Sequence, residues 1–144
     1  MWGLCTVEST VLTQSVQKLQ NCAARIICKN FDFVNVRGID LVNELGWQTI
    51  ETRRNFHIAT LMFKCIHGLA PDYLCDQVTL VSEIATRSTR SAHSLDVVIP
   101  KVNKEIFRKS FQYSGAVVSN NLPDNVRRAD DLFTFKLQYR QCYF

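Results

Sequence analysis

Apolar residues recur near the start of this chain at the spacing of one face of an α-helix. The five that share this face are Leu12, Val16, Leu19, Ala23 and Ile26. Their separations of four, three, four and three residues place them all on one side of a helix. We expect the helix to begin just after Ser9 or Thr10, because either hydroxyl can cap its first turn. The stripe lasts only about two heptads, which favours a helix packed in a globular core over a coiled coil.

Helical spacing also covers the middle and the end of the chain. A short helix is predicted from Ile39 to Leu45 with Gly46 as its cap, and a longer one from Thr49 to Gly68. The expected buried stripe of the longer helix is Phe56, Ala59, Phe63 and Ile66. Two later stripes, separated by Leu122-Pro123, are Phe107, Phe111 and Ser114, and then Leu132, Phe135 and Leu137.

Residues 79–104 have a different character. The stretch "SEIATRSTRSAHS" at 82–94 is polar and rich in hydroxyl groups, which predicts an exposed loop over 79–104. "LDVVIP" at 95–100 is the one candidate for a short extended segment. A chain of 144 residues fits one domain. The sequence therefore predicts a single all-α domain over 1–144, with a long polar loop and at most this short extended segment.

The positive charge of the chain lies in its second half. Residues 1–78 carry seven basic and seven acidic side chains, whereas residues 79–144 carry ten basic and six acidic ones. A basic region can contact nucleic-acid phosphates without reading sequence, although such charges can also be no more than a solvated face. The candidate phosphate-binding residues are Arg87, Arg90, Lys101, Lys104, Arg108, Lys109, Arg127 and Arg128.

Enzyme and metal chemistry have no motif in this sequence. The six cysteines include no closely spaced pair of the kind that binds zinc. Cys22 and Cys28 are about 600° apart on a helix and point away from each other. No glycine-rich phosphate loop or catalytic triad is recognisable. We therefore expect no enzymatic activity, no metal and no cofactor.

Asp130 and Asp131 require separate treatment because an Ala-Asp-Asp sequence also occurs in polymerase active sites. Such a pair binds two metal ions and needs a hairpin and a third carboxylate. Here Arg127-Arg128 precedes the pair and an amphipathic stretch follows it. Aspartates in the first turn of a helix cap it and interact favourably with its dipole, so capping is the favoured interpretation.

The N-terminus has no basic segment followed by an apolar run, so no secretory signal is predicted. No apolar stretch approaches the ~20 residues needed to span a bilayer. We expect an intracellular protein with reduced cysteines and no membrane association.

Several motifs occur in an order that resembles one family. They are "WG" at 2–3, "KLQNCAARII" at 18–27, "LVNELGWQTIETRR" at 41–54, "LMFKCIHGLAPDYL" at 61–74, "TRS" at 86–88, "KSFQYSGAVVSNNLPDNVR" at 109–127 and "LFTFK" at 132–136. Together they are similar to the region C-terminal to the polymerase core in reverse transcriptases of jockey- and RTE-like non-LTR retrotransposons. The resemblance implies a thumb-like helical module that helps to hold template RNA and the primer–template duplex.

Two positions depart from the family pattern. Cys22 stands where the family usually has arginine, although the second arginine of that motif is kept as Arg25. Ser119 stands where a tryptophan is usual, which would remove a large apolar anchor. The family's endonuclease and catalytic aspartates lie upstream of the matching region, and Met1 directly precedes the matching Trp-Gly. These features favour a truncated, degenerate remnant with at most weak non-specific RNA or DNA binding. The alternative is a helical protein–protein interaction module recruited by the host, with unknown protein partners.

Overall fold

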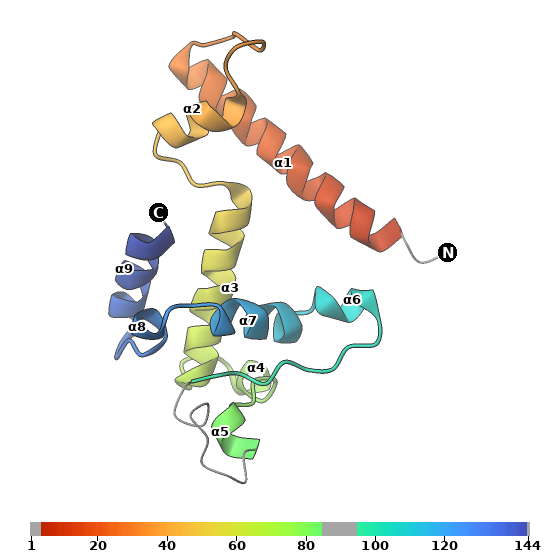
Figure 1. Ribbon diagram of the computed structural model, residues 1–144, viewed down its shortest axis with the longest axis vertical. Helices are drawn as coiled ribbons and strands as arrows, with labels where there is room; N and C mark the ends of the chain where they lie inside the picture. The colour runs from red at the N-terminus through yellow and green to blue at the C-terminus, as the bar shows by residue number, and fades with distance from the viewer. Residues whose placement is uncertain (1–3, 85–94, 144) are drawn as a thin grey trace. The chain divides into compact units, whose positions relative to one another are not determined.

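The computed structural model describes the backbone of residues 4–84 and 95–143, and the side chains of residues 11–84 and 95–143 (Figure 1). The helices within these ranges are α1 (Leu4–Cys28), α2 (Gly38–Glu44), α3 (Ile50–Ile66), α4 (Asp72–Cys75), α5 (Val81–Ile84), α6 (Glu105–Arg108), α7 (Phe111–Asn120), α8 (Asp124–Arg127) and α9 (Leu132–Tyr143). In the same ranges, extended pairing is limited to one antiparallel bridge between Leu80 and Val97. The predicted all-α fold is confirmed.

The chain divides into two compact units, Met1–Arg54 and Asn55–Phe144. The division falls within the first turns of α3, so α3 contributes residues to both. Each unit has hydrophobic clusters of its own. Whether the two behave as the single domain expected from the sequence stays a prediction.

In the first unit, α1 packs against α2 through small side chains. The buried hydrophobic residues of this unit are Ala24, Leu41 and Val42. A Cβ atom placed on Gly38 would lie 2.7 Å from the Cβ of Asn21, so the two helices approach too closely there for a side chain on α2. Gly46, with φ of +66°, follows α2 as predicted, because glycine adopts this left-handed conformation without steric cost.

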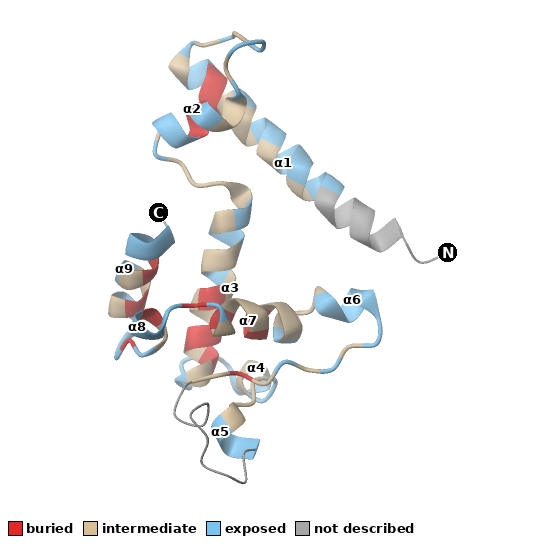
Figure 2. Ribbon diagram, viewed as in Figure 1, coloured by how far each residue is buried: buried red, intermediate tan, exposed pale blue. Residues whose placement is uncertain are grey.

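The orientation of α1 differs from the prediction. The helix begins at Leu4 instead of after Ser9 or Thr10. Four members of the apolar stripe are exposed, from 46% for Val16 to 70% for Leu19 (Figure 2). Among residues 11–28 of α1, the buried ones are Ala24 and Arg25, which lie on the opposite side. The prediction that the stripe is buried in the core is therefore wrong within this unit: close helix approach at Gly38 requires the face with small side chains.

Arg25 closes the connection between α1 and α2. Its Nη1 and Nη2 atoms donate hydrogen bonds to the carbonyl oxygens of Asp32 (2.8 Å) and Val36 (2.6 Å). Its guanidinium carbon lies 4.4 Å from the centre of the Phe33 ring. The side chain is buried, and the two bonds satisfy carbonyls of a loop that has no helical partners for them.

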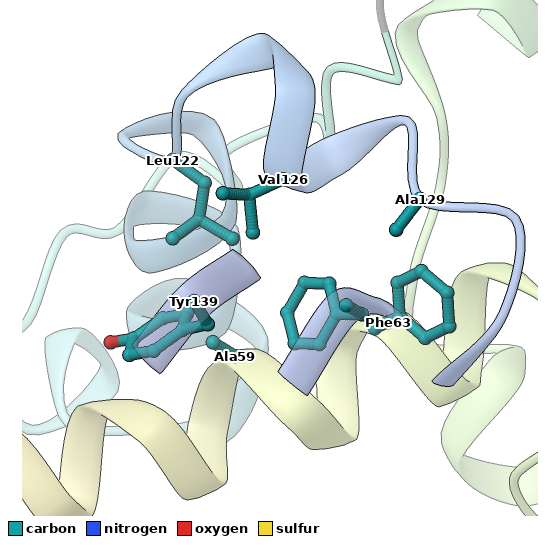
Figure 3. Close-up of a cluster of buried hydrophobic side chains, with 7 residues drawn as sticks. Ala59, Phe63, Leu122, Val126, Ala129 and Tyr139 are labelled. Carbon is teal, nitrogen blue, oxygen red and sulfur yellow. The ribbon is translucent and has the colours of Figure 1, made fainter. Parts of the chain in front are cut away.

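In the second unit, the main core lies between α3, α8 and α9. Its buried residues are Ala59, Phe63, Leu122, Val126, Ala129, Phe135 and Tyr139, most of which Figure 3 labels. The rings of Phe63 and Phe135 are 4.5 Å apart between centres. Ala59 and Phe63 are buried and Phe56 and Ile66 partly so, which confirms the predicted stripe. Thr49 accepts a hydrogen bond from the Thr52 amide (3.2 Å) and caps α3 as expected, and Gly68 (φ +65°) follows its end.

A second cluster, which contains Met62, Val97 and Ala116, corrects part of the predicted loop. Val97 is only 3% exposed. The Asn120 side chain accepts from its amide (2.9 Å) and donates to its carbonyl (2.8 Å). The prediction that all of 79–104 is exposed is therefore wrong at Val97, because this apolar side chain packs in a cluster with Met62 and Ala116. Residues 85–94 of the predicted loop lie outside the described residues.

The C-terminal helices begin at side-chain caps. Ser110 interrupts the stripe predicted through Phe107 and Phe111, because its Oγ accepts from the Tyr113 amide and starts α7 afresh. Asp131 accepts from the Thr134 amide (2.7 Å) at the start of α9. Capping by this aspartate is confirmed.

Candidate nucleic-acid interface

The segment from Pro100 to Gln112 forms a hollow on the second unit. Lys104 has extended backbone (φ −122°, ψ 136°) and leads into the single turn of α6, after which Ser110 begins α7. The hollow has a volume of about 360 Å³, and its lining residues are Pro100, Lys101, Val102, Asn103, Lys104, Phe107, Ser110 and Gln112. Its floor is fixed by two contacts: Ser110 Oγ donates to the Phe107 carbonyl (2.7 Å), and Gln112 donates to the Gln77 carbonyl (3.1 Å).

The charged residues that line the hollow are both positive. Residues 101–109 contain four of the predicted phosphate-binding residues and one acidic residue, Glu105. Lys101 and Lys104 line the hollow. Lys101, Lys104 and Arg108 are exposed, and Lys109 is half-buried. Exposed ammonium and guanidinium groups around a concave surface are the arrangement that attracts phosphate oxygens.

Phe107 was expected on one continuous helix with Phe111 and Ser114, yet it lies on the separate turn α6. It is 57% exposed and lines the hollow. An exposed ring beside lysines is a common feature of single-strand binding surfaces, because bases stack on aromatic rings while phosphates meet the charges. The signal that could have found it is Ser110, a residue type that starts a new helix and so ends the stripe containing Phe107.

The remaining predicted residues do not join this surface. Arg127 is a poor candidate for a phosphate contact, because it forms ion pairs with Asp96 and Asp124 and its side chain is only 14% exposed. Two carboxylates next to one guanidinium leave no net positive charge for a phosphate. Arg128 is exposed at the end of α8 and does not line the hollow. Arg87 and Arg90 lie outside the described residues.

The described cysteines show no arrangement for catalysis. Cys65 and Cys75 are neighbours near the ends of α3 and α4, and burial, followed by the proximity of Cys75, raises the pKa of the Cys65 thiol. A raised pKa reduces the thiolate fraction, which is the nucleophilic and metal-binding form. Within the described ranges, no group of three His, Cys, Asp or Glu side chains could hold a metal ion.

Comparison with known proteins gives no relative from which a function for the hollow could be inferred. No protein-family model, curated protein or solved structure matches this chain. Across residues 4–84 and 95–143, every helix is too short or too polar to cross a membrane.

Proposed function

We propose that this chain is a non-enzymatic helical module that binds RNA or DNA weakly and without sequence preference. The observation that carries the proposal is the hollow at 100–112, where Lys101 and Lys104 face the same space as an exposed Phe107. Phosphate contacts to lysine and arginine supply affinity but carry no sequence information. The resemblance to the C-terminal region of non-LTR reverse transcriptases supports the same function, since that region holds template and primer.

The test is a salt titration of binding to a fluorescently labelled, unstructured single strand. Three phosphate contacts, from the exposed Lys101, Lys104 and Arg108, predict a slope of about −2.1 in a plot of log affinity against log salt, which corresponds to about an 18-fold loss between 50 and 200 mM salt. The double substitution Lys101→Gln and Lys104→Gln should reduce the slope to about −0.7.

The matched control removes the same charge elsewhere. Arg53 and Arg54 are both exposed on α3 and line no part of the hollow, so Arg53→Gln with Arg54→Gln should leave the slope unchanged. Affinity that is independent of salt, or equal losses in the two double variants, would overturn the assignment to this surface.

A protein–protein interaction module is the second candidate function. It is favoured by the exposed apolar stripe of α1, because contiguous exposed apolar surface marks interaction sites in folded proteins. Absence of nucleic-acid binding at low salt, with the chain folded, would favour this alternative.

A further inference from the structure

The backbone of Phe107 is fixed on both sides by hydrogen bonds. Its amide donates to the Lys104 carbonyl (3.0 Å), and its own carbonyl accepts from the Ser110 amide (3.1 Å) and from the Ser110 hydroxyl (2.7 Å). Its side chain is nevertheless exposed and lines the hollow at 100–112. A ring whose backbone is held in place before a ligand arrives loses less conformational entropy on binding. Phe107 is therefore prepared for a contact on its exposed surface.

We propose that the hollow selects single-stranded nucleic acid over duplex by stacking one unpaired base on Phe107, while Lys101 and Lys104 contact the adjacent phosphates. This inference rests on the proposed function and adds the form of nucleic acid that the site takes. The lining combines apolar Pro100, Val102 and Phe107 with the two lysines. Bases stack on aromatic rings and phosphates meet positive charges, so an unpaired nucleotide matches both parts of the lining.

The shape of the site disfavours a double helix. A volume of about 360 Å³ is near the lower end of the range for pockets that hold a small ligand, which suits one nucleotide. Proteins that bind duplex through an apolar side chain insert it as a wedge between base steps. Phe107 instead lines a concave surface, so a base has to enter the hollow to reach the ring. A paired base would first have to leave its stack and its partner, which costs free energy.

The polar groups of the hollow provide little means of reading which base is bound. The Ser110 hydroxyl donates to the Phe107 carbonyl (2.7 Å), and the Gln112 side chain donates to the Gln77 carbonyl (3.1 Å). Donors that are used within the protein are not directed at base edges, where sequence is read. Stacking accepts every base, because each has a π face. The site should therefore distinguish the form of the strand and not its sequence.

Positive charge keeps this surface in contact with water. Lys101, Lys104 and Arg108 are exposed, and burial of a charged group without a partner is costly. Another apolar surface could cover the hollow only by removing these charges from water. A single strand brings phosphates to the charges and a base to the ring, so the two features together select this occupant.

Fluorescence anisotropy of the full chain at low salt tests the proposal with three labelled probes of equal nucleotide number. The probes are a thymidylate strand, an abasic strand with the same phosphates, and a hairpin duplex. The thymidylate strand should bind about 5- to 150-fold more tightly than the abasic strand, which is the contribution of one stacked base. It should also bind more tightly than the duplex, although phosphate contacts alone favour the higher charge density of a duplex. A uridylate strand should match thymidylate, because the sugar takes no part in the stack.

Two variants assign the preference to the ring. Phe107→Leu keeps an apolar side chain but removes the aromatic surface, so thymidylate and abasic strands should bind it equally, with the salt slope still at about −2.1. Phe133→Leu is the matched control, because Phe133 is 74% exposed on α9 of the same unit and does not line the hollow. This control should keep the wild-type preference.

The outcomes separate this inference from the proposed function. Salt-dependent binding that is equal for thymidylate and abasic strands, or tightest for the duplex, would overturn the inference and leave the proposed function standing. Absence of salt-dependent binding to every probe would overturn both. A folded Phe107→Leu variant that keeps the wild-type preference would show that the base stacks elsewhere and would also overturn the inference. The wild-type comparison of the probes decides the question even if Phe107→Leu fails to fold.

Discussion

Replacement of Arg25 by methionine should destabilise the first unit by a few kcal/mol. Arg25 is 7% exposed, donates to the carbonyls of Asp32 and Val36, and lies over the Phe33 ring. A hydrogen bond from a charged group contributes about 1.5–3 kcal/mol, and an exposed cation–π contact about 0.5–1 kcal/mol. Methionine retains the aliphatic stem, and water can reach part of the loop, so the lower end of both ranges applies. We expect a loss of about 3.5 kcal/mol in the free energy of unfolding.

Tryptophan fluorescence can report this loss selectively. The chain has two tryptophans, Trp2 and Trp47, and both belong to the unit Met1–Arg54. A urea titration followed by their emission therefore measures the first unit. Lys18→Met is the matched control, since Lys18 is exposed on the same helix and the charge change is identical. The reasoning is refuted if the unfolding free energies of the two variants agree within about 0.5 kcal/mol, the usual range for surface substitutions.

Three further changes test the packing and the capping by thermal or chemical denaturation followed by far-UV circular dichroism. Gly38→Ala should destabilise the first unit by about 1–3 kcal/mol, because the new Cβ would meet Asn21 Cβ at 2.7 Å; an unchanged midpoint would contradict this close approach. Ser119→Trp should also destabilise, because the space beside Ser119 measures only about 10 Å³ and a larger side chain overpacks the core; increased stability would show that the core can reopen. Hydrogen bonds from Thr134 hold the pKa of Asp131 below its usual 3.8, so its contribution to stability is present above that pH and is lost as the pH falls through the lowered pKa. Asp131→Asn should weaken this pH dependence, and an unchanged acid-unfolding profile would contradict the capping role.

Local rules predicted the helices of this chain well. Thr49, Gly46, Gly68 and Asp131 all act as the caps or terminators that their residue types indicate. Their effect depends on backbone conformation and on hydrogen bonds within four residues. The buried stripe of α3 was predicted correctly because Phe56, Ala59, Phe63 and Ile66 recur at helical spacing within eleven residues. Information of this kind is contained in short windows of sequence.

The predictions that were wrong concern which surfaces of the chain pack against each other. Periodicity identified the stripe of α1 but could not show that α2 would pack on the opposite side, because that choice depends on the close approach of Gly38 to Asn21. Val97 was placed in the predicted loop over 79–104 because the stretch at 82–94 is polar, whereas a distant residue, Asn120, binds its backbone. Phe107 fitted a helical period that Ser110 breaks. In each case the deciding contact joins residues far apart in sequence, or a single side chain overrides a period.

The same distinction determines what the positive charge of the chain can do. Ten basic and six acidic residues between 79 and 144 suggest a diffuse basic surface when they are only counted. The structure shows that these charges are not equivalent, because Asp96 and Asp124 neutralise Arg127 within the second unit. Within residues 101–109, Lys101, Lys104 and Arg108 are exposed, and Glu105 is the single acidic residue. Coulomb attraction for a phosphate depends on such local density and falls off within about 10 Å at 0.1 M salt. The concave segment at 100–112, and not the total charge of the chain, is therefore the surface on which we propose that nucleic-acid binding depends.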